Sequence, residues 1–275
     1  MQADGRAIIV GVIDLHIHIL PGLDDGPATE DAAVQMARAA VGLGTRAVAT
    51  TSHVDAGFGL RGGAIGAARE ALAARLRAEG IHLNLLAGGE VAPERLPRLD
   101  DEALAALTLG GGGTLLLECP FAPVGAAMEP LVADLRGRGF GVLLAHPERS
   151  PSFQRDPGRL ARLVELGASA QVTAGSLAGV FGSLVALTAY AMLEAGLVHV
   201  IASDAHDTQR RTPDLRVGAE ELTQRYGDME DQLAWMTEAA PAAILDGRPL
   251  SDRPPLPSPP ARGVRARIRR AWSAR

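Results

Sequence analysis

The feature that most constrains the fold is a series of short apolar runs separated by segments of helical character. Each run is mostly continuous rather than alternating, which is typical of parallel strands buried on both faces. Strands that alternate with helices predict a parallel sheet with helical crossovers. The seven runs span residues 7–14, 46–51, 83–88, 114–118, 140–145, 169–173 and 197–203.

Seven such strands favour an α/β fold of the incomplete or distorted (β/α) barrel type, and 275 residues is a normal length for one barrel. A doubly wound open sheet is the competing topology, because periodicity does not separate the two. The first helix is expected to begin after Thr29, a suitable N-cap, and to stop at Gly42 and Gly44. Further helices are expected over residues 64–79, 126–137, 157–166, 183–195 and 214–237.

Composition narrows the class of protein. An apolar content of 47% suffices for one large core, and with only 3% aromatic residues, Ala, Val and Leu must fill it. The net charge of −5 gives no reason to expect nucleic acid as a partner. The single cysteine, Cys119, excludes a disulfide within the chain. The N-terminus does not resemble a signal peptide and no run of about 18 apolar residues is present, so we expect a cytoplasmic protein.

The last 25 residues differ from the rest of the chain and divide it into a domain over residues 1–250 and a tail over residues 251–275. Five prolines between Ser251 and Pro260 predict an extended linker. Six arginines and no acidic residues follow between Arg262 and Arg275. We expect this tail to be disordered and solvated. A short basic amphipathic helix in weak contact with an anionic membrane surface is the alternative.

Residues of the types that bind metal ions follow six of the seven runs. His16 and His18 are one residue apart on an extended backbone, so their side chains point to the same side. In a barrel, the carboxyl ends of all strands meet at one rim. Mixed imidazole and carboxylate ligands favour Mn²⁺, Fe²⁺ or Zn²⁺ over Mg²⁺ or Ca²⁺, and their number implies two or three ions. The candidates are His16, His18, Asp24, Asp25, His53, Glu90, Glu118, His146, Glu148, Asp204 and His206.

Three other reactive residues, two histidines and the cysteine, are interpreted as structural. His82 lies on the polar side of an alternating segment, and His199 lies inside an apolar run. Cys119 is not expected to be a nucleophile of the Cys-x5-Arg kind, because that loop requires arginine at position 125 and Gly125 stands there.

These motifs resemble the PHP (polymerase and histidinol phosphatase) superfamily, and within it the tyrosine-protein phosphatases of bacterial capsular and exopolysaccharide operons. Their order and spacing match from about residue 12 to residue 247. Three departures lie at Val54-Asp55, Thr173 and Ala239, where relatives commonly carry His, Asn and Asn. The matching segments are Ile13–His18, Leu23–Pro27, Thr50–His53, Gly88–Glu90, Leu117–Glu118, Ala145–Arg149, Ala174–Leu177 and Ala202–His206.

The resemblance implies a distorted seven-stranded TIM-like barrel with a trinuclear centre that typically contains Mn²⁺, with Fe²⁺, Zn²⁺, Mg²⁺ or Co²⁺ as alternatives. It implies that Arg149 and Arg211 bind the phosphate. The sequence does not identify the group that protonates the leaving group, for which His206 and Glu148 are the candidates. The implied ligand sets are His16, His18, Glu90 and Asp204 for one ion, Glu90, Glu118 and His146 for a second, and Asp25, His53 and His206 for the third.

The function expected from this resemblance is metal-dependent hydrolysis of phosphotyrosine on the tail of a membrane-associated, polysaccharide-synthesis tyrosine kinase. A small-molecule phosphatase of the histidinol-phosphate type and a non-catalytic metal-binding regulatory module are the alternatives. An amidohydrolase with a carboxylated lysine is disfavoured because the chain has no lysine. Homo-oligomerisation is left open.

Overall fold

The computed structural model describes residues 11–58, 62–121 and 128–257, and within these ranges all strand pairs are parallel. The strands are β1 (Val12–Ile17), β2 (Thr45–Thr50), β3 (His53–Val54), β4 (Asn84–Leu86), β5 (Glu90–Val91), β6 (Thr114–Glu118), β7 (Gly141–Ala145), β8 (Ser169–Thr173) and β9 (Val200–Ala202).

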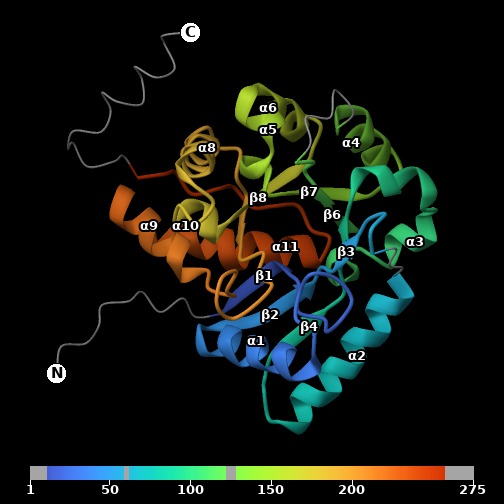
Figure 1. Cartoon of the computed structure of the whole chain (residues 1–275). Helices are drawn as coiled ribbons and strands as arrows, with labels where there is room; N and C mark the ends of the chain where they lie inside the picture. Colours follow the sequence, from blue (N-terminus) through green and yellow to red (C-terminus); the bar gives the residue numbers. More distant parts are fainter. Residues whose placement is uncertain (1–10, 59–61, 122–127, 258–275) are drawn as a thin grey trace, which may run out of the picture.

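Helices cover the outside of the strands: α1 contacts β2, α2 contacts β4, and α4 contacts β7 (Figure 1). The α-helices are α1 (Glu30–Gly42), α2 (Gly62–Ala78), α3 (Asp101–Ala105), α4 (Met128–Gly137), α5 (Pro151–Arg155), α6 (Gly158–Glu165), α7 (Ala174–Leu177), α8 (Ser183–Glu194), α9 (Arg216–Tyr226), α10 (Glu230–Ala234) and α11 (Ala240–Leu245). The 3₁₀ turns are η1 (Pro93–Arg98), η2 (Leu109–Gly111) and η3 (Pro147–Arg149), and η4 (Trp235–Ala239) is π-helical.

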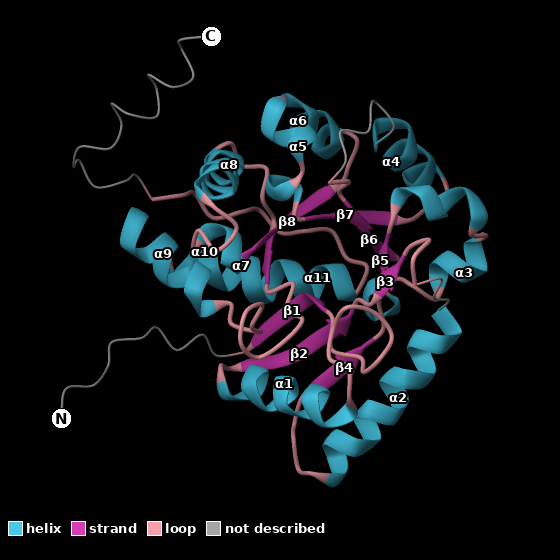
Figure 2. Ribbon diagram, in the orientation of Figure 1, coloured by secondary structure: helices cyan, strands magenta, loops and turns pink. Residues whose placement is uncertain are grey.

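The strands form two sheets, ordered β1-β2-β4 and β3-β5-β6-β7-β8-β9 (Figure 2). β2 pairs with β4 in the first sheet, and β3 pairs with β5 in the second. The chain therefore passes from the first sheet to the second twice, between β2 and β3 and again between β4 and β5. The predicted parallel α/β class is confirmed. A single seven-stranded barrel is not confirmed, because the described strands divide between two sheets.

The two sheets meet where the end of β1 lies beside the residues that follow β9. Ile17 and Ala205 form an isolated parallel bridge. The His18 N–H donates to Ala205 O at 2.9 Å, and the Asp204 N–H donates to His16 O at 2.8 Å. This junction brings the first strand, with its two histidines, against the last.

The first helix forms as expected: the Thr29 hydroxyl accepts a hydrogen bond from the Ala32 N–H at 3.2 Å, and Val34, Ala37 and Ala40 face the core. The single helix expected over residues 214–237 is wrong. α9 ends at Tyr226, and the next residue, Gly227, has a φ of 87° that suits glycine and breaks the helix.

After this break, the second helical stretch runs through a π-helical turn, η4, into α11. Pro241 at the start of α11 lacks an N–H group and cannot donate to the carbonyl one turn earlier, which explains the widened turn there.

The first part of the expected tail packs on the body. The Trp235 Nε1–H donates to the Ser251 hydroxyl at 3.0 Å, and the Arg253 guanidinium donates to Leu193 O and Gln232 Oε1, each at 3.3 Å. Leu256 packs against the core. Residues 251–257 are therefore part of the folded body rather than a free linker. The arginine-rich remainder lies outside the described residues, so its prediction stays a prediction.

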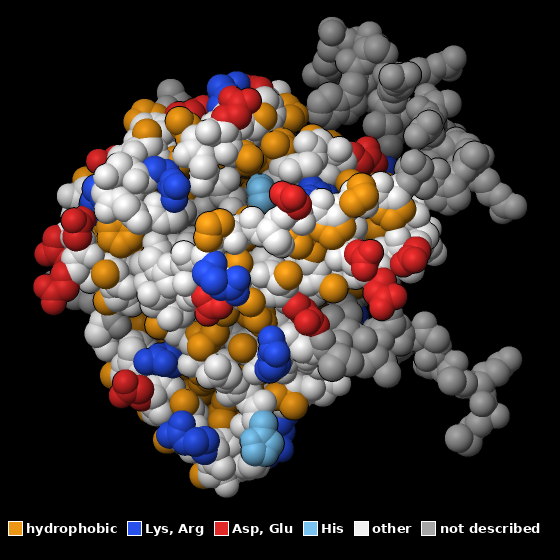
Figure 3. Space-filling view, turned by 180° about the vertical axis from the view of Figure 1, so that it is seen from behind, with side chains coloured by type: hydrophobic (Ala, Val, Ile, Leu, Met, Phe, Trp, Pro, Cys, Tyr) orange, Lys and Arg blue, Asp and Glu red, His pale blue; other side chains and the backbone are white. Residues whose placement is uncertain are grey.

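The surface seen from behind has acidic and basic side chains interspersed among apolar and neutral ones (Figure 3). Within the described ranges, no helix is both long and apolar enough to cross a bilayer.

We expect Gly112→Ala to destabilise the fold. A Cβ at this position would lie 2.2 Å from Leu245 O and 2.6 Å from Ile244 O, so the backbone between η2 and α11 would have to shift. The free energy of unfolding, measured by urea denaturation, should fall by about 1–3 kcal/mol. Gly42→Ala is the matched control, because its Cβ meets nothing within 4 Å. Equal effects of the two substitutions would contradict the close approach.

Candidate metal centre

The site begins at the end of β1, where His16 and His18 are fully buried and point to the same side. Their Nε2 atoms lie 3.2 Å apart. This close approach of two ring nitrogens is what the alternation of side chains along a strand predicts. Two nitrogens at this separation can bind one ion together.

The Glu90 carboxylate, at the start of β5, lies among four imidazoles. Its Oε2 atom is 3.3 Å from His16 Nε2, 3.4 Å from His18 Nε2 and 3.1 Å from His53 Nδ1. Its Oε1 atom is 3.0 Å from His146 Nε2. A carboxylate with both oxygens facing imidazoles is placed to bridge two ions.

The loop after β9 contributes Asp204, whose Oδ1 lies 3.3 Å from His16 Nε2 and 3.5 Å from His18 Nε2. Asp204 has φ 52° and His146 has φ 36°, and they are the only non-glycine residues of the described ranges with positive φ. Strained backbone of this kind persists where the surrounding structure holds a side chain in one direction, and it gathers at functional sites.

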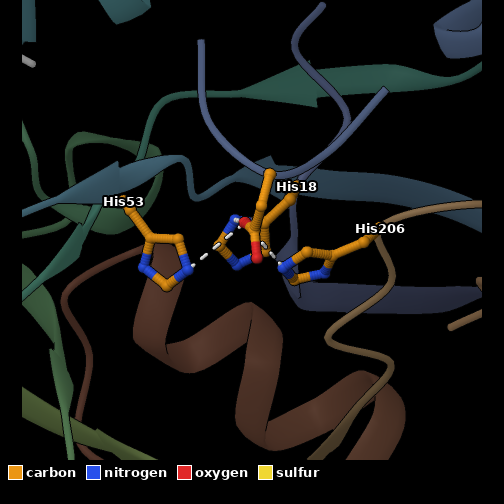
Figure 4. Close-up of side chains that lie close together, drawn as sticks. His18, His53 and His206 are labelled. Carbon is orange, nitrogen blue, oxygen red and sulfur yellow. Dashed lines mark ion pairs between the residues drawn. The ribbon is translucent and has the colours of Figure 1, made fainter. Parts of the chain in front are cut away.

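A third group surrounds Asp25, in the loop before α1. Its Oδ1 lies 3.1 Å from His206 Nε2, 3.5 Å from His53 Nε2 and 4.0 Å from His18 Nδ1. Figure 4 shows the rings of His18, His53 and His206 turned toward one another, with dashed lines for the ion pairs. This is the accessible side of the cluster, since the Asp25 side chain is 51% exposed and that of His53 is 17% exposed.

The structure brings together all nine residues of the implied ligand sets. They fall into four overlapping groups whose ligand atoms lie within 4.8 Å of one another. The group around Asp25 includes His18 in addition to the three residues implied for the third ion. His53 also belongs to the group that contains Glu90 and Glu118. The groups are His18, Asp25, His53 and His206; His16, His18 and Asp204; His16, Glu90 and His146; and His53, Glu90 and Glu118.

The donors of this cluster fit divalent ions. Among the described residues, Glu90 Oε2, His53 Nδ1 and His206 Nε2 are buried without a hydrogen-bond partner. Buried polar atoms in this state are costly unless another ligand satisfies them. Imidazole nitrogens with carboxylate oxygens are the donors that Mn²⁺, Fe²⁺, Co²⁺ and Zn²⁺ accept.

The two histidines interpreted as structural lie away from these groups. His82 is exposed between buried Ile81 and Leu83. His199 Nδ1 accepts a hydrogen bond from the Ala170 N–H at 3.2 Å, which links β9 to β8.

Two further residues orient the histidines: Asp24, which the sequence placed among the candidate ligands, and Gln171, which was not singled out from the sequence. Asp24 Oδ2 accepts from His18 Nδ1–H at 2.9 Å and from the His53 N–H at 3.0 Å, and Gln171 Oε1 accepts from His16 Nδ1–H at 3.0 Å. These bonds turn the Nε2 atoms of both histidines toward the cluster. The available signal for Gln171 was a glutamine in the middle of a buried strand.

Both arginines implied to bind phosphate reach the edge of the cluster. Arg149 NH1 and Arg211 NH2 donate to the same oxygen, Asp204 Oδ2, the second at 2.5 Å. Glu148 is fully buried, and its Oε1 accepts from the Thr173 N–H at 3.0 Å and the Thr173 hydroxyl at 3.1 Å. This arrangement favours a structural role for Glu148 over proton donation to a leaving group.

The electrostatics of the cluster favour cations at its centre. Burial alone would lower the pKa of His18, but the hydrogen bond to Asp24 and the nearby carboxylates of Glu90 and Asp204 raise it to about 10. Burial, with the charge of Glu90, raises the pKa of Glu118 to about 8. In the metal-free protein, His18 and Glu118 therefore carry protons at neutral pH, and these protons offset the negative charge of the other carboxylates.

Fold and site together define a class: parallel α/β proteins with a candidate multinuclear metal centre of histidines and carboxylates at strand ends. Residues 12–245 match the family described as capsular polysaccharide synthesis, CpsB/CapC. The chain belongs to this family.

Curated relatives and solved structures agree with this assignment. Tyrosine-protein phosphatase YwqE of Bacillus subtilis is 34% identical over 247 residues, which are 90% of this chain and 96% of YwqE. Tyrosine-protein phosphatase CpsB of Streptococcus pneumoniae is 24% identical over 78% of this chain and 91% of CpsB.

A crystal structure from work on YwqE and CpsB, described as unique metal-dependent tyrosine phosphatases, has a TM-score of 0.79 and 34% identity, covering 90% of this chain and 99% of that chain. A β-aspartyl dipeptidase of Fervidobacterium islandicum, with a TM-score of 0.50 and 15% identity over 86% of this chain and 72% of that chain, shares the fold alone.

We expect Asp24→Asn to weaken metal binding without unfolding the protein. The amide retains the shape of the carboxylate but loses the charge that orients His18 and His53. Affinity for Mn²⁺, measured by isothermal titration calorimetry, should fall by about 10- to 100-fold. Asp100→Asn, at the N-cap of α3 and outside the four groups, is the matched control. Unchanged affinity of Asp24→Asn would contradict its orienting role.

Metal binding should release protons and strengthen as the pH rises. His18 has its pKa raised to about 10, so it is protonated at neutral pH without ions, and a bound ion must displace that proton. Titrations with Mn²⁺ at about pH 7 in two buffers of different ionisation enthalpy give the number of protons released. A count of zero, or affinity that falls with rising pH, would show that His18 is already neutral.

Proposed function

We propose that this protein is a metal-dependent protein-tyrosine phosphatase that hydrolyses phosphotyrosine. The observation that supports this most directly is the convergence of Arg149 and Arg211 on one oxygen of Asp204, beside the Glu90 cluster. Two guanidinium groups next to a cationic centre form a binding site for a phosphate dianion.

The nine residues named above would hold two or three ions, which we propose are Mn²⁺, with Fe²⁺, Zn²⁺, Mg²⁺ or Co²⁺ as alternatives. The proposed sets are those implied by the resemblance, with His18 and His53 each close to a second set. Divalent ions at this position would neutralise phosphate charge and lower the pKa of water. We keep the distorted barrel as the description of the fold, with β2/β3 and β4/β5 each counted as one strand.

The chain's own residues would then bind and orient the phosphate. Arg149 and Arg211 would exchange their hydrogen bonds with Asp204 for bonds to phosphoryl oxygens, which bidentate guanidinium groups favour. Phenol has a solution pKa of about 10, so a tyrosine leaving group needs less protonation than serine does. His206 is the proposed proton donor of the form without the third ion, because its Nε2, which lies beside Asp25, cannot bind an ion and carry a proton at the same time.

Cys119 is not the nucleophile in this proposal. It is fully buried, and burial, with nearby acidic residues, raises the pKa of its thiol well above the usual range. A buried neutral thiol does not attack phosphorus.

The proposed substrate is the phosphotyrosine tail of a membrane-associated tyrosine kinase of polysaccharide synthesis, and the proposed location is the cytoplasm. Weak contact of the arginine-rich tail with the membrane surface would bring the enzyme to this substrate. Homo-oligomerisation is compatible with this function and is not required by it.

The test offers the full-length, Mn²⁺-loaded protein a phosphotyrosine peptide, histidinol phosphate and a nucleotide monoester in parallel. We expect the phosphotyrosine peptide to be hydrolysed with the highest kcat/KM. A preference for histidinol phosphate would support the small-molecule alternative instead. No hydrolysis of any ester with the metal bound would support the non-catalytic module.

Arg149→Ala should lower kcat/KM for the peptide on the order of 100-fold, because it removes a charged donor at the phosphate. Arg149→Lys should recover only part of this loss, since lysine keeps the charge but not the bidentate geometry. Cys119→Ser is the control and should keep most of the activity. An inactive Cys119→Ser protein that is folded would overturn the metal mechanism.

A further inference from the structure

The placement of phenylalanine in this chain is uneven. The chain has only five. Phe140 and Phe153 are buried in the core, as expected of large apolar side chains. The other three contact residues of the candidate site, and two of them, Phe58 and Phe121, are 43% and 47% exposed. A single exposed apolar side chain is ordinary, but two exposed aromatic rings beside one candidate site offer apolar and aromatic contact to a ligand.

Phe58 lies on the accessible side of the cluster. Its ring is nearly parallel to that of His53, with an interplanar angle of 5° and centroids 6.0 Å apart. A local turn fixes the backbone that presents it, because the Phe58 N–H donates to Asp55 Oδ1 at 2.8 Å. Asp55 lies where relatives of the resembled family differ from this chain, and here it serves this turn.

Phe121 lies beside the opposite end of the cluster. Its ring stacks on that of His146 at 5.5 Å and 26°, and the Arg149 guanidinium lies over it at 5.1 Å. The backbone just before it is also held, since the Ser150 hydroxyl donates to Pro120 O at 2.6 Å. Phe181 covers Arg149 as well, at 4.3 Å.

The two exposed rings thus flank the cluster, each against a histidine that faces Glu90. The Phe58 backbone is hydrogen-bonded through its own N–H, and Phe121 follows directly on the hydrogen-bonded Pro120. Their edges and outer faces offer aromatic contact to a group attached to a phosphate held by Arg149 and Arg211. Aromatic pairs prefer offset or edge-to-face geometry at 4.5–7 Å, and such contact adds to the burial of apolar area.

The geometry points to Phe58 and Phe121 as an aromatic rim that binds the ring of an aryl phosphate and so selects aryl over alkyl phosphate esters. This inference deepens the proposed function and rests on it, because it assigns the residues that would recognise the tyrosine side chain. The phosphate-binding arginines treat all phosphate monoesters alike, so the selectivity must come from groups that contact the ester side. The aromatic rim supplies such groups.

The test measures binding rather than turnover, so that leaving-group chemistry does not enter. Benzylphosphonate and ethylphosphonate are titrated by calorimetry into the full-length, Mn²⁺-loaded protein. The wild type should bind benzylphosphonate more tightly. Phe58→Ala and Phe121→Ala should each lower this preference by about three- to tenfold, with the affinity for ethylphosphonate within about twofold of the wild type.

Conservative variants distinguish the contribution of the aromatic ring from that of side-chain size. Phe121→Tyr and Phe58→Tyr should keep the preference, whereas the leucine variants should keep only part of it. Leu166→Ala removes a comparably exposed apolar side chain, 42% exposed and outside the site, and should change nothing. Circular dichroism confirms that each variant is folded, and manganese titration shows whether it still binds the metal.

Three results would overturn the aromatic rim. They are alanine variants that bind both phosphonates equally more weakly, alanine variants whose affinity for benzylphosphonate is unchanged, and a wild type that binds both phosphonates with the same affinity. A protein that hydrolyses no phosphotyrosine but shows a ring-dependent preference would overturn the proposed function and leave the rim in place. A protein that hydrolyses phosphotyrosine but prefers benzylphosphonate equally in the wild type and in the alanine variants would support the proposed function and overturn the aromatic rim.

Discussion

The interaction on which the site depends is the contact of one buried carboxylate, Glu90, with four imidazoles. Such a cluster is unstable as separate charges, because burial penalises each of them and several ligand atoms remain without hydrogen bonds. Burial would raise the pKa of Glu90, but the surrounding histidines lower it well below its usual range. The carboxylate is therefore ionised and needs positive charge around it, from protons on the histidines or from metal ions.

The cluster can form only where β1 and β9 lie side by side. Asp14, in β1, links the two strands through hydrogen bonds. Its carboxylate accepts hydrogen bonds from the Ser203 hydroxyl at 2.5 Å, the Ser203 N–H at 3.1 Å and the His16 N–H at 3.2 Å. Burial raises the pKa of Asp14 to about 6, in spite of these bonds. Asp14 thus holds β1 against the end of β9, where Asp204 adopts its strained backbone.

The sequence predicted the parts of this structure that depend on local pattern. Continuous apolar runs placed the strands, Thr29 placed the start of α1, and ligand-type residues after the strands placed the nine members of the cluster. The division into two sheets was not predictable, because the breaks after β2 and β4 depend on pairing between distant segments. The break at Gly227 was missed because a glycine is tolerated within a helical pattern until its φ is known.

Residues that act through others were the hardest to find, for a physical reason. Asp24 was placed among the candidate ligands, but no spacing in the sequence reveals the hydrogen bonds through which Asp24 and Gln171 orient histidines. Phe58 and Phe121 read as ordinary apolar residues until their exposure and ring contacts are measured.

The contacts of Phe58 and Phe121 matter because one part of the cluster is closed to solvent and another part is open to it. His16, His18 and Glu90 are closed to solvent, whereas Asp25, His53 and Arg211 are partly open. A ligand can therefore reach the ions only past the open residues, and Phe58 lies against one of them, His53. In the proposed function, Arg149, Arg211 and the ions would fix where a phosphate sits, and the exposed rings would limit what is attached to it. The division of roles follows from burial: His16, His18 and Glu90, which are closed to water, would only hold ions, whereas Asp25 and His53 could hold an ion and also face the substrate.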